Sequence, residues 1–164
     1  ETPFGKGSLG ANEVYDPLTD RWELKSPLPI ARDHFAVAVV DGKIHAMGGR
    51  LKNSYSHNLS LHDVYDPERD AWSSAAPLRK PRSGVAAVAL RGKIHLFGGE
   101  APEATDSDHD IYDPEADLWA PGHPMPTARH GLAAAAVEDK VYLLTGGRRP
   151  GASISNTNEI FRPG

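Results

Sequence analysis

The chain has 164 residues, a formal net charge of −4 and no cysteine. The weak charge gives no polybasic surface for nucleic acid or an anionic membrane, no apolar run approaches the roughly 18 residues that span a bilayer, and disulfides, thiolate nucleophiles and Cys-ligated zinc are excluded. Sixteen glycines and 14 prolines favour short strands joined by turns, and nothing in these totals identifies a cellular compartment.

The first expected elements are the two strands joined by the turn in EVYDPLTDRW, residues 13–22. Proline fixes φ near −65° and the preceding Asp can accept a local backbone hydrogen bond, so Asp16-Pro17 predicts a tight turn. Trp22 then opens an outer strand. Residues 1–26 are therefore expected to supply only the third and fourth strands of a repeating unit.

Residues 27–76 show the full unit of four strands. HFAVAVV is apolar and ends at Asp41-Gly42, a strong signal for a two-residue hairpin. KIHAMGG returns, and Gly48-Gly49 permits positive φ or close backbone approach. A long loop then leads to a third strand around Asp63–Tyr65, a turn, and a fourth strand that begins near Ala71.

Residues 77–123 copy this unit, and residues 124–164 copy its first three strands. GLAAAAV in the last unit resembles a helix by composition, because alanine has the highest helix propensity. Its position corresponds to β-branched strands in the other units, so a strand is predicted. Small side chains are typical of an innermost strand where several sheets converge on one axis.

A fixed period joins these units. Trp22, Trp72 and Trp119 are separated by 50 and 47 residues (72 − 22 and 119 − 72). The same period holds for four further markers, which are the aromatic residue of the turn, the proline and the arginine before the inner strand, and the double glycine: Tyr15, Tyr65, Tyr112 and Phe161; Pro27, Pro77 and Pro124; Arg32, Arg82 and Arg129; Gly48-Gly49, Gly98-Gly99 and Gly146-Gly147. Four-stranded units of this length indicate a β-propeller.

The order Arg, apolar strand, turn, strand, Gly-Gly, loop, Tyr-Asp-Pro and Trp resembles the kelch repeat over nearly the whole chain. The resemblance implies an all-β fold of four-stranded antiparallel blades, here an incomplete ring of about three blades where family members close with about six or seven. Blade boundaries are expected at 1–26, 27–76, 77–123 and 124–164. Because repeats bury their faces only against neighbours, the remaining blades are expected from the same longer chain or from a second copy.

The arginines are the leading candidates for ligand contact. Arg32, Arg82 and Arg129 precede the inner strands and would circle a central mouth, where guanidinium groups suit carboxylates or phosphates; in kelch members that bind acidic peptides, the equivalent arginines line such a mouth. The alternative is that each arginine serves its own repeat by capping carbonyls or pairing with an acid. Arg50 and Tyr55 in the long loop, together with His130, complete the predicted ligand-binding set.

Metal and cofactor chemistry finds little support. Asp106, Asp108 and Asp110 have the spacing that begins a calcium loop, but Ile111 stands where that loop needs glycine. His45 and His95 share one repeat position, and His62 and His109 share another, so all four are interpreted as strand packing. No catalytic residue, metal or cofactor is predicted.

Two classes of function remain. The first is a non-enzymatic module that binds a protein or peptide through loops on one propeller face, with a preference for acidic ligands. The second is a carbohydrate enzyme, since some kelch-like propellers are sialic acid mutarotases or galactose oxidases. An oxidase is disfavoured because its cysteine-linked tyrosine cannot form. The non-enzymatic module is the preferred hypothesis.

Overall fold

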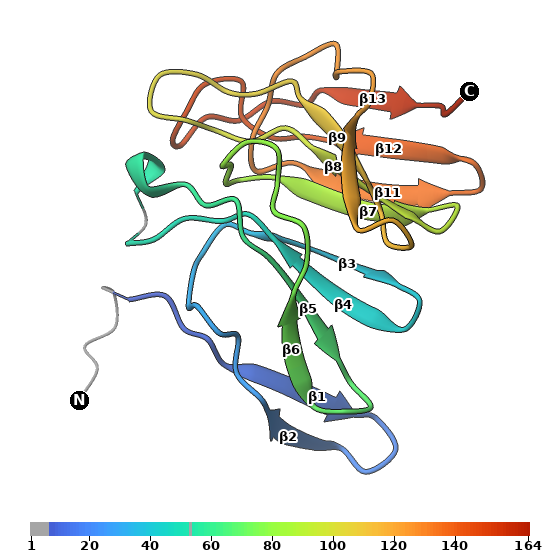
Figure 1. Ribbon diagram of the computed structural model, residues 1–164. Coiled ribbons are helices and arrows are strands. Elements are labelled where there is room, and N and C mark those ends of the chain that lie inside the picture. Colours follow the sequence, from blue (N-terminus) through green and yellow to red (C-terminus); the bar gives the residue numbers. More distant parts are fainter. Residues whose placement is uncertain (1–6, 53) are drawn as a thin grey trace.

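The computed structural model describes residues 7–52 and 54–164, and its regular elements are strands apart from one short 3-10 helix (Figure 1). The strands form four antiparallel sheets, in chain order of two, four, four and three strands. The elements are β1 (Asn12–Asp16), β2 (Arg21–Lys25), β3 (Ala36–Val40), β4 (Lys43–Met47), η1 (Tyr55–His57), β5 (His62–Asp66), β6 (Ala71–Ser74), β7 (Ala86–Leu90), β8 (Lys93–Phe97), β9 (His109–Asp113), β10 (Leu118–Pro121), β11 (Ala133–Val137), β12 (Lys140–Leu144) and β13 (Asn158–Phe161).

Each sheet keeps its strands in sequence order, so the connections within a sheet are simple up-and-down steps. The first strands of successive sheets, β3, β7 and β11, lie next to one another, and the fourth strands lie at the outer edge (Figure 1). The alanine tract is the strand β11, paired with β12 from Ala133↔Leu144 to Val137↔Lys140. The predicted all-β fold with radially arranged blades is confirmed.

The hydrophobic core lies between the sheets rather than within one of them. One cluster joins the β3–β6 and β7–β10 sheets and includes Met47, Ile94 and Leu96, whose side chains are completely buried. A second cluster joins the β7–β10 and β11–β13 sheets around Phe97 and Val141. Each sheet therefore depends on its neighbours for burial, as repeat proteins do.

The glycines of the repeat bring one blade against the next. Gly48 and Gly49 have φ of 68° and 100°, and a Cβ on Gly48 would lie 2.5 Å from the carbonyl oxygen of Arg82. The Gly49 N–H donates to that same oxygen at 2.9 Å. A larger residue would break this contact, which explains why the unit requires glycine here.

The third double glycine is offset by one residue from the predicted alignment. Thr145, with φ of 57°, and Gly146 occupy the places of Gly48 and Gly49, because β12 ends at Leu144 where β4 ends at Met47. Gly147 then pairs with His130, in the place that Arg50 takes opposite Asp33. Alignment by residue identity therefore placed the third double glycine one residue away from its structural equivalent.

The Tyr-Asp-Pro…Trp segment clamps each blade to the one before it. The Tyr65 hydroxyl donates to Asp70 at 2.7 Å, and this carboxylate accepts the backbone N–H of Ser26 at 2.8 Å. Trp72 Nε1 donates to the carbonyl oxygen of the same Ser26 at 2.8 Å. Both polar backbone groups of one residue are thus satisfied by the next repeat.

The next blade repeats the clamp on Ala76. Tyr112 donates to Asp117 at 2.8 Å, Asp117 accepts the Ala76 N–H at 2.8 Å, and Trp119 Nε1 donates to the Ala76 carbonyl at 2.9 Å. Hydrogen bonding to the Ala76 N–H and to Tyr112 lowers the pKa of Asp117. The repeated residues of the sequence are therefore contacts between blades.

Candidate functional site

Three loops of different length lie on the same face of the molecule. They join the second and third strands of successive sheets, over residues 48–61, 98–108 and 145–157. Figure 1 shows them together on its left side, opposite the short β3–β4, β7–β8 and β11–β12 turns. We call this surface the loop face. Recognition by repeat propellers commonly uses such loops on a rigid scaffold.

The first predicted ligand residues, Arg32, Arg82 and Arg129, lie inside their own blades. Their exposed fractions are 2%, 0% and 0%. Arg32 donates to Asp63 at 2.8 Å and to the carbonyl of Gly48 at 2.8 Å.

The other two arginines make equivalent bonds. Arg82 pairs with Asp110 and also donates to the carbonyl of Gly98 at 3.2 Å. Arg129 donates to Glu159 at 2.7 Å and to the Thr145 carbonyl at 2.7 Å. In each blade the arginine ties the start of the inner strand to the end of the second strand and to an acid of the third. This geometry favours the structural interpretation of the three arginines.

Two other predicted residues are brought together at the loop face. Arg50 donates to Glu100 at 2.7 Å, and the second oxygen of Glu100 lies 3.2 Å from Nδ1 of His130. Arg50 also contacts Asp33 at 3.2 Å. Glu100 is 2% exposed, so these contacts lie beneath the loops. Arg50, Glu100 and His130 belong to three successive blades, which this polar network joins. Sequence reasoning did not identify Glu100, although it directly follows a repeat double glycine.

The remaining predicted residue, Tyr55, lies in η1, and its side chain is outside the part that the structure describes. Exposed cations on the loop face are Lys52, Arg148 and Arg149. Glu103 is also exposed there, and Lys80 pairs with Asp106 at 2.6 Å. The loop face therefore carries both signs of charge.

The predicted strand histidines form buried pairs. His45 Nδ1 lies 2.9 Å from His62 Nε2, and His62 Nδ1 lies 3.1 Å from the carbonyl of Ala76. Because a carbonyl only accepts, His62 carries its proton on Nδ1 and accepts from His45 at Nε2. Burial lowers the pKa of His45 to about 4 and also lowers the pKa of His62. His95 and His109 repeat the pair at 2.9 Å.

Metal ligation is not supported by any cluster within residues 7–52 and 54–164, where no three His, Asp or Glu side chains gather closely enough to hold an ion. In the same residues no helix has the length and apolar character to cross a membrane. The arrangement on the loop face can form hydrogen bonds and ion pairs with a partner.

Comparison with known proteins agrees with the repeat pattern. The family model described as the Kelch motif matches residues 31–79 and 81–126, which together cover more than half of the chain. Kelch-like protein 15 of Danio rerio is 38% identical over 52 residues, and this similarity covers 32% of the chain and 9% of that protein. The chain thus matches only a small part of this relative's length.

Proposed function

The chain belongs to the kelch-repeat family, and from this membership we propose that it is a non-enzymatic module that binds a protein or peptide through its loop face. The observation that carries the proposal is the polar network of Arg50, Glu100 and His130, which joins three blades beneath loops of different length. A rigid base under adaptable loops reduces the entropy lost on binding. Kelch repeats and the similarity to a kelch-like protein support an interaction role.

A preference for acidic ligands is the finer part of this proposal. It rests on the exposed side chains of Lys52, Arg148 and Arg149. Arg32, Arg82 and Arg129 contribute to the scaffold instead, since their guanidinium groups are already engaged inside the blades. Exposed cations steer acidic partners and make association sensitive to salt.

Further blades complete the module in this proposal, supplied by the same longer chain or by a second copy. Apolar side chains at both ends of the blade series support it: Val37 and Val39 are 48% and 56% exposed at one end, and Val137 is 54% exposed at the other. Equivalent residues between the central sheets are buried, as Val40 and Leu90 show at 6% and 7%. Such surfaces normally face a neighbouring blade.

Selection from a displayed peptide library that contains equal numbers of acidic and basic sequences tests the binding role. We expect enrichment of acidic peptides, whose affinity, measured by calorimetry, falls several-fold when Lys52, Arg148 and Arg149 are changed to Glu. The matched control is Arg69→Glu, because Arg69 is equally cationic, 83% exposed and lies in the β5–β6 turn, away from the loop face.

Two outcomes contradict the proposal. Equal loss of affinity in the Arg69→Glu control would place binding elsewhere, and enrichment of basic peptides would remove the acidic preference. The carbohydrate-enzyme alternative required an arginine-lined mouth, and the three arginines lie inside the blades instead. Catalysed anomeric exchange of sialic acid, followed by NMR, would nevertheless restore that alternative.

A further inference from the structure

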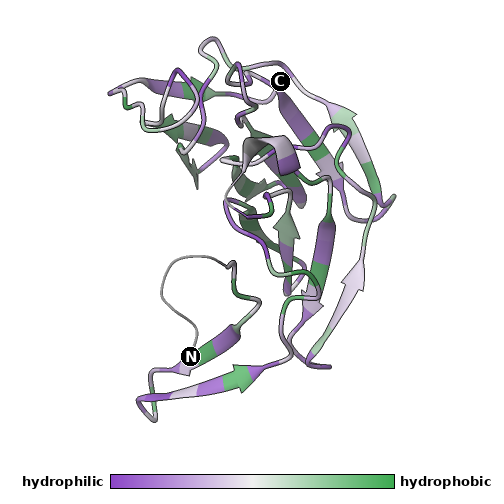
Figure 2. Cartoon of the chain, turned by 90° about the vertical axis from the view of Figure 1, so that its left-hand side faces the viewer, coloured by the Kyte–Doolittle hydropathy of each residue, from purple (hydrophilic) through white to green (hydrophobic). Residues whose placement is uncertain are grey.

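One buried carboxylate attaches the third loop of the loop face to the blade before it. Glu100 Oε1 accepts from Arg50 at 2.7 Å. Glu100 Oε2 accepts the backbone N–H of Gly151 at 3.0 Å and lies 3.2 Å from Nδ1 of His130. Figure 2 looks onto the loop face and shows the blades along an arc, so the loops of successive blades lie side by side. The loop at 145–157 is therefore joined to the loop at 98–108 through Glu100.

The ring of His130 lies between two hydrogen-bond acceptors. Nε2 is 3.0 Å from the carbonyl oxygen of Arg149, and a carbonyl oxygen only accepts. Nδ1 faces the Glu100 carboxylate, which also only accepts when it is ionised. A neutral imidazole has one N–H and would direct a lone pair at one of these oxygens. The imidazolium form of His130, with a proton on each nitrogen, satisfies both.

The charges around His130 favour the same form. Hydrogen bonds from Arg50 and from the Gly151 N–H stabilise the ionised carboxylate of Glu100. Arg50 is shared, because its Nε also lies 3.2 Å from Asp33. A buried carboxylate that shares its arginine is stabilised by a second cation, which His130 supplies. The charged residues around His130 come from its own loop and from the two preceding blades, and they are Arg148, Arg149, Glu100, Arg50 and Asp33.

A second histidine of this network has the opposite arrangement. His34 Nδ1 lies 2.7 Å from Asp33, and His34 Nε2 lies 2.9 Å from the guanidinium group of Arg50. Because a guanidinium group only donates, His34 accepts at Nε2 and carries its one proton on Nδ1. The neutral form of His34 therefore satisfies both of its contacts, and His34 is an internal reference for the charge of His130.

We propose that protonated His130 holds residues 149–153 of the loop face against Glu100, and that loss of this proton releases them. These residues form a closed turn, since Ser153 Oγ donates to the Arg149 carbonyl and accepts the Arg149 N–H at 3.1 Å. Thr105 Oγ1 donates to the Arg148 carbonyl at 3.2 Å, and this contact does not depend on a titrating group. Release is thus confined to the turn at 149–153, which we call the latched turn.

The direction of the pH effect follows from proton linkage. When the turn is latched, His130 retains a proton that it loses on release, so a rise in pH favours release. Histidine side chains change charge between about pH 5 and 8. The buried strand histidines His45 and His109, whose pKa is about 4, stay neutral over the upper part of this range. A response near neutral pH therefore does not come from those two residues.

The consequence for binding rests on the proposed function. Arg148 and Arg149 are two of the exposed cations that it assigns to acidic ligands. Near pH 6 the latched turn presents Arg149 in a fixed position, whereas near pH 8 a ligand has to order the turn as it binds. We expect a peptide rich in Asp and Glu, taken from the displayed library, to bind about two- to tenfold more weakly near pH 8.

NMR of the 164-residue chain tests the charge of His130 directly. Near pH 6 both ring nitrogens of His130 should have the chemical shifts of protonated nitrogen, whereas His34 should have one protonated and one unprotonated nitrogen. The Gly151 amide should titrate together with His130, and residues 149–153 should become more mobile as the pH rises. A His130 ring with an unprotonated nitrogen near pH 6, or a Gly151 amide that does not respond when His130 loses its proton, would overturn the proposal.

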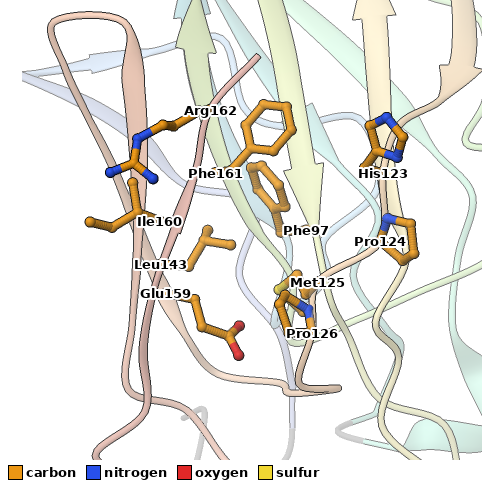
Figure 3. Close-up of a pocket in the computed structure, with 10 residues that line it drawn as sticks. All are labelled: Phe97, His123, Pro124, Met125, Pro126, Leu143, Glu159, Ile160, Phe161 and Arg162. Carbon is orange, nitrogen blue, oxygen red and sulfur yellow. The ribbon is translucent and has the colours of Figure 1, made fainter. Parts of the chain in front are cut away.

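His130→Gln removes the titrating group and keeps a polar side chain. Residues 149–153 should then be mobile at both pH values, and the peptide affinity should no longer change between them. His123→Gln is the matched control, because His123 is an exposed histidine that lines a different feature, a pocket of about 260 Å³. Figure 3 shows it there with Pro124 and Phe161. The control should keep the pH response of the wild-type turn.

The outcomes separate this inference from the proposed function. A turn that is equally ordered near pH 6 and near pH 8, or a pH response that survives in His130→Gln, would overturn the latch. A latch that titrates while peptide affinity stays constant would contradict its control of binding. A latch that titrates in a chain that binds no library peptide would contradict the proposed function and support the role of His130.

Discussion

Individual buried charges show how the repeat uses arginine. Arg82 has no exposed surface, and its guanidinium group pairs with Asp110, which is 3% exposed. Arg79 approaches the other oxygen of Asp110 at 2.7 Å but is half exposed. Removal of Arg82 would leave the buried Asp110 carboxylate with only this half-exposed partner, in a medium that solvates charge poorly. Arg82 thus contributes to stability because it compensates the charge of the buried Asp110.

Arg82→Ala is therefore expected to lower the free energy of unfolding by about 3–5 kcal/mol. Arg69→Ala is the control, because Arg69 is 83% exposed and contacts Asp66 only at 3.8 Å, and its change should alter stability by less than about 1 kcal/mol. Urea unfolding followed by circular dichroism measures both. Equal midpoints for the two variants would return Arg82 to the ligand-binding candidates.

At the scale of the strand, the role of a repeated position depends on the residues that it contacts. His45 on β4 and His62 on β5 form a hydrogen-bonded pair that ends on Ala76 of the following linker. In the last sheet Tyr142 and Asn158 occupy the same two positions. Asn12 still makes the equivalent bond by donating to the Ser26 carbonyl at 3.2 Å. A neutral donor, and not a charge, is what this position requires.

The histidine pairs predict an acid-sensitive stability. Burial lowers the pKa of His45 and of His109 from 6.5 to about 4, so the unfolded chain takes up these protons first as pH falls. The unfolding free energy is then complete above about pH 6.5 and decreases between about pH 6.5 and 4. Urea unfolding at several pH values measures this slope.

The chain supplies its own control for that slope. His45→Tyr with His62→Asn copies the Tyr142 and Asn158 pair and removes one of the two titrating pairs. Its pH dependence should be shallower, with the remainder due to His95 and His109. An unchanged slope would assign the acid sensitivity to other groups.

The clamp on the outer strand predicts a graded response at Trp119. Trp119→Phe removes the hydrogen bond to the Ala76 carbonyl and should cost about 1 kcal/mol, whereas Trp119→Ala also empties the space of a 6% exposed ring and should cost about 3–5 kcal/mol. Leu118→Ala, at a 61% exposed neighbour, should change stability by less than about 0.5 kcal/mol. Equal effects of all three changes in thermal unfolding would contradict the clamp.

The strands of each blade could be predicted from the sequence because the repeat period determines their positions. Strand β11 was identified against its alanine-rich composition since its position in the repeat was known. The partners of Arg50 could not be predicted, because Glu100 is 50 residues away and meets it only after two blades pack. The one-residue offset that puts Thr145 and Gly146 in the places of Gly48 and Gly49 could not be predicted either. Backbone conformation, and not residue identity, sets the register there.

For the whole molecule, stability is distributed along the series of blades. The central strands β8 and β9 have partners on both sides and sheets on both faces, whereas β1 and β2 pair only with each other within the described residues. A two-stranded hairpin alone is marginally stable in water. Opening of β1–β2 should therefore require much less free energy than opening of β8–β9.

Hydrogen exchange followed by mass spectrometry should reveal this gradient. In dilute protein, amides of β1–β2 are expected to exchange at least about tenfold faster than those of β8–β9, because local opening exposes them without disturbing the two core clusters. Slow exchange of β1–β2 in dilute protein would show instead that the hairpin is stable by itself.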